Sequence, residues 1–142
     1  VNTKASLDDF LQKIGNFHDS CIKEMLYTSG AFVNHGLAMH PINDKRNLKV
    51  VLQRQSKSIS MMELEFIQIN YVKLMPVLEA YTCELLDATV ILKDDCIIWC
   101  DMGGLSEEDI EKYDGTVISA AKLRWRVIDG HMGDGAFYSG RG

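Results

Sequence analysis

Residues 62–74 read MELEFIQINYVKL, and this stretch shows most clearly what kind of structure the chain forms. Met62, Leu64 and Phe66 alternate with two glutamates, which is the period of two expected of a β-strand with one buried face. The alternation breaks in the middle of the stretch, where we expect a β-bulge. Pro76 limits the end of the strand, because proline cannot donate to a sheet ladder.

Strand patterns recur on both sides of this stretch. They are predicted at 21–28 (CIKEMLYT), 48–55 (LKVVLQRQ), 81–95 (YTCELLDATVILKDD), 96–101 (CIIWCD) and 116–128 (TVISAAKLRWRVI), with a weaker pattern between 32 and 39. Turn-forming residues separate them at 41–47 (PINDKRN) and 56–60 (SKSIS). The pair Asp94-Asp95 indicates a hairpin between two of the strands.

Two short helices are predicted. In 6–15 (SLDDFLQKIG) four apolar residues form one stripe, Ser6 is expected to cap the start and Gly15 to end the helix in a left-handed conformation. The stripe consists of Leu7, Phe10, Leu11 and Ile14. In 105–115 (LSEEDIEKYDG) Ser106 is the expected cap, and three acids follow it in the first turn.

The order of these segments predicts the fold class. The strands follow one another without long helices between them, and parallel pairing would need long crossovers. We therefore expect an α+β fold, mainly an antiparallel β sheet in the form of a curved sheet, a sandwich or a half-barrel, with an N-terminal helix and one short acidic helix. The 142 residues predict a single domain, 1–142, with a loosely ordered glycine-rich tail at 129–142.

Composition limits the possible partners and the compartment. Acids outnumber bases 20 to 15, giving a net charge of −5, whereas nucleic-acid binders usually carry a basic excess. No apolar run approaches the ~18 residues of a membrane-spanning helix. The first ten residues, VNTKASLDDF, contain no apolar core of a signal peptide. We expect a cytoplasmic, bacterial-type protein that binds neither nucleic acid nor membrane.

The four cysteines are expected to be free thiols. Cys96 and Cys100 lie in a predicted strand, where residues four apart are separated by about 13 Å. A disulfide needs Cα atoms within about 7 Å. Cys21 and Cys83 lie far from this pair and from each other in the sequence, and a cytoplasmic location disfavours disulfides.

The stretch FHDSC at 17–21 raises the question of chemistry, since His18, Asp19, Ser20 and Cys21 follow one another. A two-metal HD phosphohydrolase would need further ligands on helices, and a Ser-His-Asp triad requires convergence in space and not adjacency in sequence. A Cys21 nucleophile beside His18 is conceivable, although only Lys23 lies near enough in sequence to lower its pKa. The catalytic candidates are therefore His18, Asp19 and Cys21.

The alternative interpretation of FHDSC is structural. The stretch joins a predicted helix to a predicted strand, so Phe17 can pack into the core while Asp19 and Ser20 accept hydrogen bonds from free backbone N–H groups. His18 can then bond a backbone carbonyl. This interpretation is favoured over a catalytic one.

No metal or cofactor is predicted. His35 and His40 could be brought together by a turn, but no second ligand pair lies close by in the sequence. The glycines in MGGL (102–105) and HMGDG (131–135) do not form a phosphate loop or a dinucleotide fingerprint. The acids around 107–111 are most simply a solvated helix face.

The chain has, in this order, a predicted N-terminal helix, FHDSCIKEM, ELEF and a late LRWR. This arrangement resembles a set of small, uncharacterised bacterial proteins with a Phe/Leu-His-Asp-Ser/Ala start and a closing Trp-Arg. The resemblance covers about Phe17 to Arg126, and some similar proteins are immunity proteins of bacterial toxin systems. It implies a non-enzymatic, partner-binding role, with His18, Asp19, Trp125 and Arg126 as marked positions.

The functional hypothesis is therefore a non-enzymatic protein that binds a protein partner, in its specific form an immunity-type protein that neutralises a bacterial toxin domain. Arg124, Trp125 and Arg126 are its candidate binding residues. The alternative is a small enzyme or a small-ligand-binding protein that uses His18, Asp19 and Cys21. A homodimer through sheet edges or the region of Trp99 and Trp125 is also expected, because few helices cover the strands.

Overall fold

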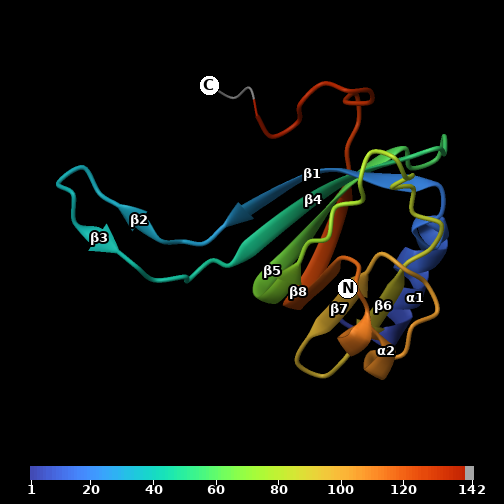
Figure 1. The fold of residues 1–142 in the computed structure, drawn as a ribbon, viewed down its shortest axis with the longest axis horizontal. Coiled ribbons are helices and arrows are strands. Elements are labelled where there is room, and N and C mark those ends of the chain that lie inside the picture. The colour runs from blue at the N-terminus through green and yellow to red at the C-terminus, as the bar shows by residue number, and fades with distance from the viewer. Residues whose placement is uncertain (140–142) are drawn as a thin grey trace.

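An antiparallel sheet of six strands forms the centre of the molecule in the computed structural model, which describes residues 1–139. The strand order is β1-β4-β5-β8-β7-β6, and every neighbouring pair is antiparallel (Figure 1). The predicted α+β class is confirmed, and the sheet is open and not closed into a barrel. The strands are β1 Ser20–Thr28, β4 Asn47–Arg54, β5 Met61–Lys73, β6 Thr89–Leu92, β7 Ile97–Cys100 and β8 Val117–Val127.

Strand β5 contains the stretch that identified the fold, and it pairs with β4 on one side and β8 on the other. The expected bulge is present: Gln68 has a φ of 57°, and the register with β8 shifts between Ile69 and Tyr71. Before the bulge, Met62, Leu64 and Phe66 point to the same buried cluster, as the alternation predicted.

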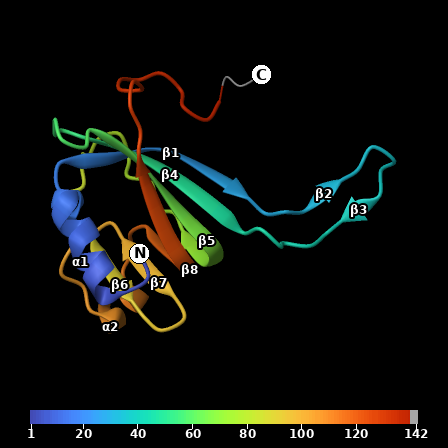
Figure 2. The same cartoon turned by 180° about the vertical axis from the view of Figure 1, so that it is seen from behind.

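Helix α1 (Lys4–Lys13) covers one face of the sheet (Figure 2). Its predicted apolar stripe is confirmed, since Leu7, Phe10 and Ile14 are buried in the main core. The predicted cap was wrong by three residues. Thr3 is the N-cap, and Ser6 stands at the third helical position, where its hydroxyl accepts from the Thr3 N–H at 3.0 Å while Thr3 Oγ1 accepts from the Ser6 N–H. This reciprocal capping box satisfies two backbone donors at once and starts the helix at Lys4.

The other face of the sheet is covered in two places. Helix α2 (Glu107–Lys112), capped by Ser106 as predicted, packs Ile110 against Ile98, Cys100 and Val117. Near the opposite end of β5, Phe137 and Tyr138 of the C-terminal tail pack against a small buried cluster of Val51, Met61 and Ile128. Helix α2 therefore covers one part of this face and the tail another.

The strand predicted at 81–95 is much shorter than expected. Only β6, Thr89–Leu92, forms regular pairing, and the Asp94-Asp95 hairpin to β7 is confirmed. The preceding residues meet the sheet at a single bridge, where the Leu85 N–H donates to the Ser20 carbonyl at 2.7 Å. Strand-forming residues at 81–88 therefore lack the continuous partner strand that a ladder needs.

A long two-stranded arm leaves the sheet between β1 and β4 (Figures 1 and 2). It carries β2 (Phe32–Val33) and β3 (Met39–His40), which pair only with each other. The weak strand pattern between 32 and 39 is thus realised as a separate ribbon. Among residues 1–139, the helices are all too short or too polar to cross a membrane.

Candidate functional site

The FHDS joint is a tight turn built from residues in left-handed backbone conformations. Asn16, Phe17 and Asp19 have φ values of 53°, 67° and 57°, and the Phe17 side chain is fully buried. The Ser20 hydroxyl donates to the Phe17 carbonyl at 2.5 Å and is itself buried. The stretch therefore forms the tight turn between α1 and β1, where the sequence predicted the joint between a helix and a strand.

The side-chain bonds in this joint differ from those expected. Asp19 Oδ2 lies 3.0 Å from His18 Nδ1, and the two side chains are 45% and 60% exposed. Ser20 donates to a carbonyl and does not accept from an N–H. The Asp19 carbonyl accepts from the N–H of Gln55, the residue after β4, at 3.0 Å, so the backbone and not the side chain of Asp19 makes this link.

A cavity of about 460 Å³ opens beside this joint. It brings together Asp19 and Cys21 of the predicted catalytic set but not His18. Ser20 is the other member of FHDSC in the lining, and its hydroxyl is engaged by Phe17. The remaining lining residues are Gln53, Arg54, Gln55, Thr82, Cys83, Glu84 and Met132.

The predicted binding residues of β8 fall on opposite faces of the sheet. Trp125 lies on the helix side, with its ring centroid 4.8 Å from that of Phe10. Arg124 and Arg126 lie on the other face, where each pairs with a glutamate directly across on β5. The three residues therefore do not form one surface. Trp99 is also in the core, 1% exposed, so it cannot contribute to a dimer surface in this structure.

The two arginines form a ladder of ion pairs with Glu63 and Glu65. Arg126 Nε lies 2.8 Å from Glu63 Oε1, and Arg124 Nε donates to Glu65. Burial alone would raise the pKa of Glu63, but hydrogen bonds from Arg126 and Tyr138 outweigh it and lower that pKa. The hydrogen bond from Arg124 is the main cause of the lowered pKa of Glu65.

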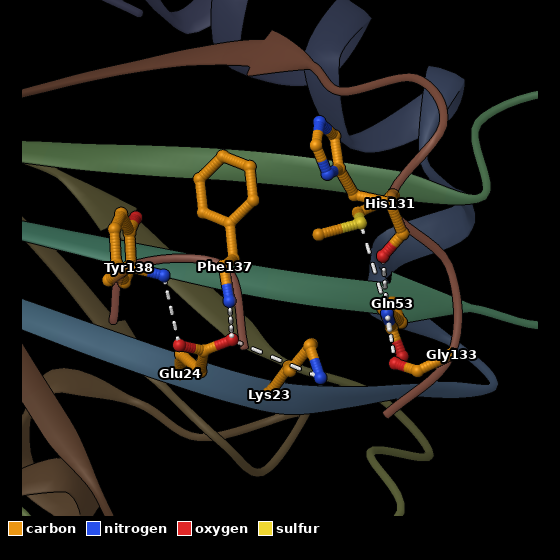
Figure 3. Close-up of polar contacts among 8 residues, drawn as sticks. Lys23, Glu24, Gln53, His131, Gly133, Phe137 and Tyr138 are labelled. Carbon is orange, nitrogen blue, oxygen red and sulfur yellow. Dashed lines mark hydrogen bonds and ion pairs between the residues drawn. The ribbon is translucent and has the colours of Figure 1, made fainter. Parts of the chain in front are cut away.

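The C-terminal tail runs over the sheet beside Glu24 of β1 and Gln53 of β4 (Figure 3). Glu24 accepts from the Phe137 N–H at 2.6 Å and from the Tyr138 N–H at 3.1 Å, which lowers the pKa of Glu24. Gln53 Nε2 donates to the carbonyls of His131 and Gly133. The prediction of a loosely ordered tail stays a prediction, and its last residues, 140–142, lie outside the described part of the chain.

The arm, residues 29–46, is highly exposed. Every residue from 31 to 45 is exposed. Residues 29–43 contain no Asp, Glu, Lys or Arg, although such residues make up 25% of the chain. Five large apolar side chains are exposed there: Phe32 at 56%, Val33 at 49%, Leu37 at 84%, Met39 at 63% and Ile42 at 64%.

The arm has a defined conformation. Phe32 stacks on the ring of His40 at 4.5 Å between centroids, and the tip is closed by Asn34, which accepts from the Leu37 N–H and, through its side chain, from the Ala38 N–H. At the base, Gly30 has a φ of 101°, and a Cβ there would stand 1.9 Å from Asp44 Oδ1. Only glycine lets the two segments approach so closely at this point.

A groove of about 520 Å³ lies at the base of the arm. Asn43 and Arg46 of the arm line it together with Leu48 and with residues of β1 and β5. The complete lining is Met25, Tyr27, Asn43, Arg46, Leu48, Ile69, Asn70, Tyr71, Val72 and Leu74.

The histidines of the arm do not form a metal site in the described structure. His40 is stacked on Phe32 and lies 3.4 Å from the amide of Asn34. Across residues 1–139, no three His, Cys, Asp or Glu side chains gather in a way that could hold a metal ion. All four cysteines are free thiols, as predicted.

Comparison of the chain with protein-family models, with curated proteins and with solved structures found no match. The resemblance to immunity-type proteins therefore remains a prediction.

Proposed function

We propose that this protein is a non-enzymatic binding protein that engages a protein partner through the arm and the groove at its base. The observation that carries this proposal is the exposure of large apolar side chains along an uncharged segment, residues 29–43. Contiguous apolar surface of this kind is characteristic of interaction sites in soluble proteins.

The energetics favour a partner over a role of the arm in folding. Full burial of one Leu, Phe or Met side chain stabilises a protein by about 1.5–3 kcal/mol. The arm gains little of this stabilisation in the free protein, because none of residues 31–45 is buried. A partner that covers Phe32, Leu37 and Met39 would recover it. The arm is held in shape by the hydrogen bonds at its tip and, at its base, by those that the Lys45 and Arg46 N–H groups donate to the Ser29 carbonyl, both at 3.1 Å. This order reduces the entropy that binding must remove.

The chemistry of the arm indicates what the partner presents. An uncharged apolar arm fits an apolar cleft, while the groove at its base accepts an apolar side chain or strand of the partner. The net charge of −5 favours association with a basic protein, because complementary fields speed encounter. These features agree with the specific form of the proposal, a cytoplasmic immunity-type protein that neutralises a basic toxin domain.

Co-expression with the product of a neighbouring toxin gene tests this proposal. Leu37→Asp places a charge at the most exposed apolar side chain of the arm, and Leu86→Asp does the same at a 66% exposed leucine outside it. We expect Leu37→Asp to lose protection against the toxin and Leu86→Asp to keep it. Full protection by Leu37→Asp would refute binding through the arm. A metabolic enzyme as the only gene neighbour would refute the immunity role.

A further inference from the structure

The C-terminal tail, residues 129–139, is held to the sheet by side chains that bind its main chain. The two carboxylate oxygens of Glu24 accept from the successive N–H groups of Phe137 and Tyr138, at 2.6 and 3.1 Å (Figure 3). Gln53 Nε2 donates to two carbonyl oxygens earlier in the tail, at 3.3 and 3.1 Å. Contacts of this kind recognise an extended backbone rather than a particular sequence, as in proteins that bind peptides.

Two aromatic side chains of the tail make the contacts that depend on sequence. Phe137 and Tyr138 pack against an apolar cluster beneath the tail. The Tyr138 hydroxyl also donates to the buried carboxylate of Glu63 at 2.6 Å. The surface under the tail therefore combines a main-chain binding site with a place for an adjacent pair of aromatic residues. The apolar cluster consists of Val51, Met61 and Ile128, all of which are buried.

The ladders of the sheet are complete without the tail. The Ile128 N–H donates to the Met61 carbonyl at 3.0 Å, and beyond it residues 129–139 make no backbone–backbone hydrogen bond within the described chain. Residues 129–136 are all exposed. Segments with few buried contacts and no ladder open at a much lower free-energy cost than the core of a protein. The tail can therefore leave the sheet while the sheet stays folded.

The surface that the tail would vacate keeps its charges balanced. Glu63 remains paired with Arg126, at 2.8 Å from Nε to Oε1, and Lys23 Nζ lies 3.9 Å from Glu24 Oε2. Departure of the tail thus leaves no isolated buried charge, which would be costly. It does leave the apolar cluster uncovered and the hydrogen-bonding groups of Glu24 and Gln53 without their partners, so the vacated surface favours a substitute of the same chemistry.

We infer that this surface is a peptide-binding site, and that the tail occupies it as an internal competitor. The external ligand is an extended segment of another protein with two adjacent aromatic residues, the second of which is a tyrosine that bonds Glu63. A tethered tail acts at an effective concentration on the order of mM, so it lowers the apparent affinity for the external segment. The residues of the site lie outside the arm and the groove at its base, so the inference is independent of the proposed arm interface.

A peptide with the sequence of residues 131–139, HMGDGAFYS, is the probe, with a fluorophore at its N-terminus and an amide at its C-terminus. Fluorescence anisotropy compares its binding to the full chain and to the full chain with Phe137→Ser and Tyr138→Ser, whose own tail no longer fills the site. We expect the double variant to bind the peptide at least about tenfold more tightly, because the competing tail is lost. The same peptide with both aromatic residues replaced by serine should not bind.

A third substitution locates the bound peptide. Glu24→Ala, added to the double variant, removes the acceptor of two peptide N–H groups and should weaken binding by at least about tenfold. Glu79→Ala is the matched control at an exposed glutamate outside the site and should leave binding unchanged. Absence of binding to a folded double variant, equal binding to the double variant and the unmodified chain, or no effect of Glu24→Ala would each overturn the inference.

If the double variant does not fold, amide hydrogen exchange in the unmodified chain decides. Millimolar unlabelled peptide should accelerate exchange of the Phe137 and Tyr138 N–H groups, because it holds the tail in its released state. The Ile128 N–H, which is bonded to the Met61 carbonyl, should keep its rate. Unchanged exchange at Phe137 and Tyr138 would show that the peptide does not displace the tail and would overturn the inference.

Discussion

Arg126 of β8 is the direct cross-strand neighbour of Glu63 of β5, with Nε 2.8 Å from Oε1. The exposed fractions of the two side chains are very unequal. The glutamate side chain is 6% exposed and the arginine 61%. Tyr138 of the tail donates to the second oxygen of the same carboxylate at 2.6 Å. One buried carboxylate therefore links β5, β8 and the C-terminal tail, and its protonation should loosen all three.

Acid should destabilise the protein through this carboxylate. The pKa of Glu63 in the folded state is lowered below its unfolded value of about 4.3. The ionised Glu63 carboxylate therefore stabilises the fold above about pH 4.3, and this stabilisation is lost as the pH falls through the folded-state pKa. Glu63→Gln should be less stable than the unmodified protein at neutral pH, and the difference should shrink below about pH 4. Urea melts across this range measure it. A difference independent of pH would contradict the assignment.

The tail should stabilise the fold through Tyr138. Tyr138→Phe removes the hydrogen bond to Glu63 and should lower the free energy of unfolding by about 1–3 kcal/mol, because a buried carboxylate loses a donor. Tyr81→Phe is the matched control, since Tyr81 is 71% exposed, and should change little. Equal stability of both variants in urea would show that the hydrogen bond from Tyr138 to Glu63 does not stabilise the fold.

Asp19 should reveal the backbone strain of the FHDS joint. Its φ of 57° lies in the left-handed region, which costs a residue with a Cβ about 1–2 kcal/mol, less for Asp than for Ala. We expect Asp19→Gly to be at least as stable as the unmodified protein and Asp19→Ala to be less stable. Thermal unfolding of the pair compares them. A more stable alanine variant would contradict the left-handed conformation.

The cysteines should react in an order set by their exposure. Cys83 is exposed, Cys21 and Cys96 are partly buried, and Cys100 is fully buried against α2. A thiol reagent should count four thiols after denaturation and modify Cys83 first and Cys100 last in the native protein. Fewer than four thiols in the denatured, unreduced protein would indicate a disulfide.

Local patterns in the sequence predicted the elements that depend on local physics. Alternation located β4, β5 and β8, and Ser106 with its acids located α2. The strand predicted at 81–88 is absent because a strand pattern reflects only the propensity of its residues. A regular ladder also requires a neighbouring strand along its whole length. The cap of α1 was misplaced because Ser6 fits both the N-cap and the third position of a capping box.

The sites depended on contacts between distant residues, which the sequence does not display. Arg54 and Cys83 line one cavity although neither lies in a motif. Glu24 holds a tail that begins more than a hundred residues later. The arm is different, since the absence of charge over 29–43 is visible in the sequence itself. The weak strand pattern at 32–39 indicates only the tendency of these residues to pair, so it does not reveal that they form an exposed surface.

Oxidative footprinting of methionines tests binding through the arm most directly. Met39 on the arm is 63% exposed, and Met102, outside the arm and the groove, is 47% exposed. The experiment compares the free protein with its complex with the basic toxin domain that we propose as its partner. We expect oxidation of Met39 to slow strongly in the complex while Met102 reacts at an unchanged rate. Unchanged oxidation of Met39 in a saturated complex would contradict the proposal that the arm is the binding element.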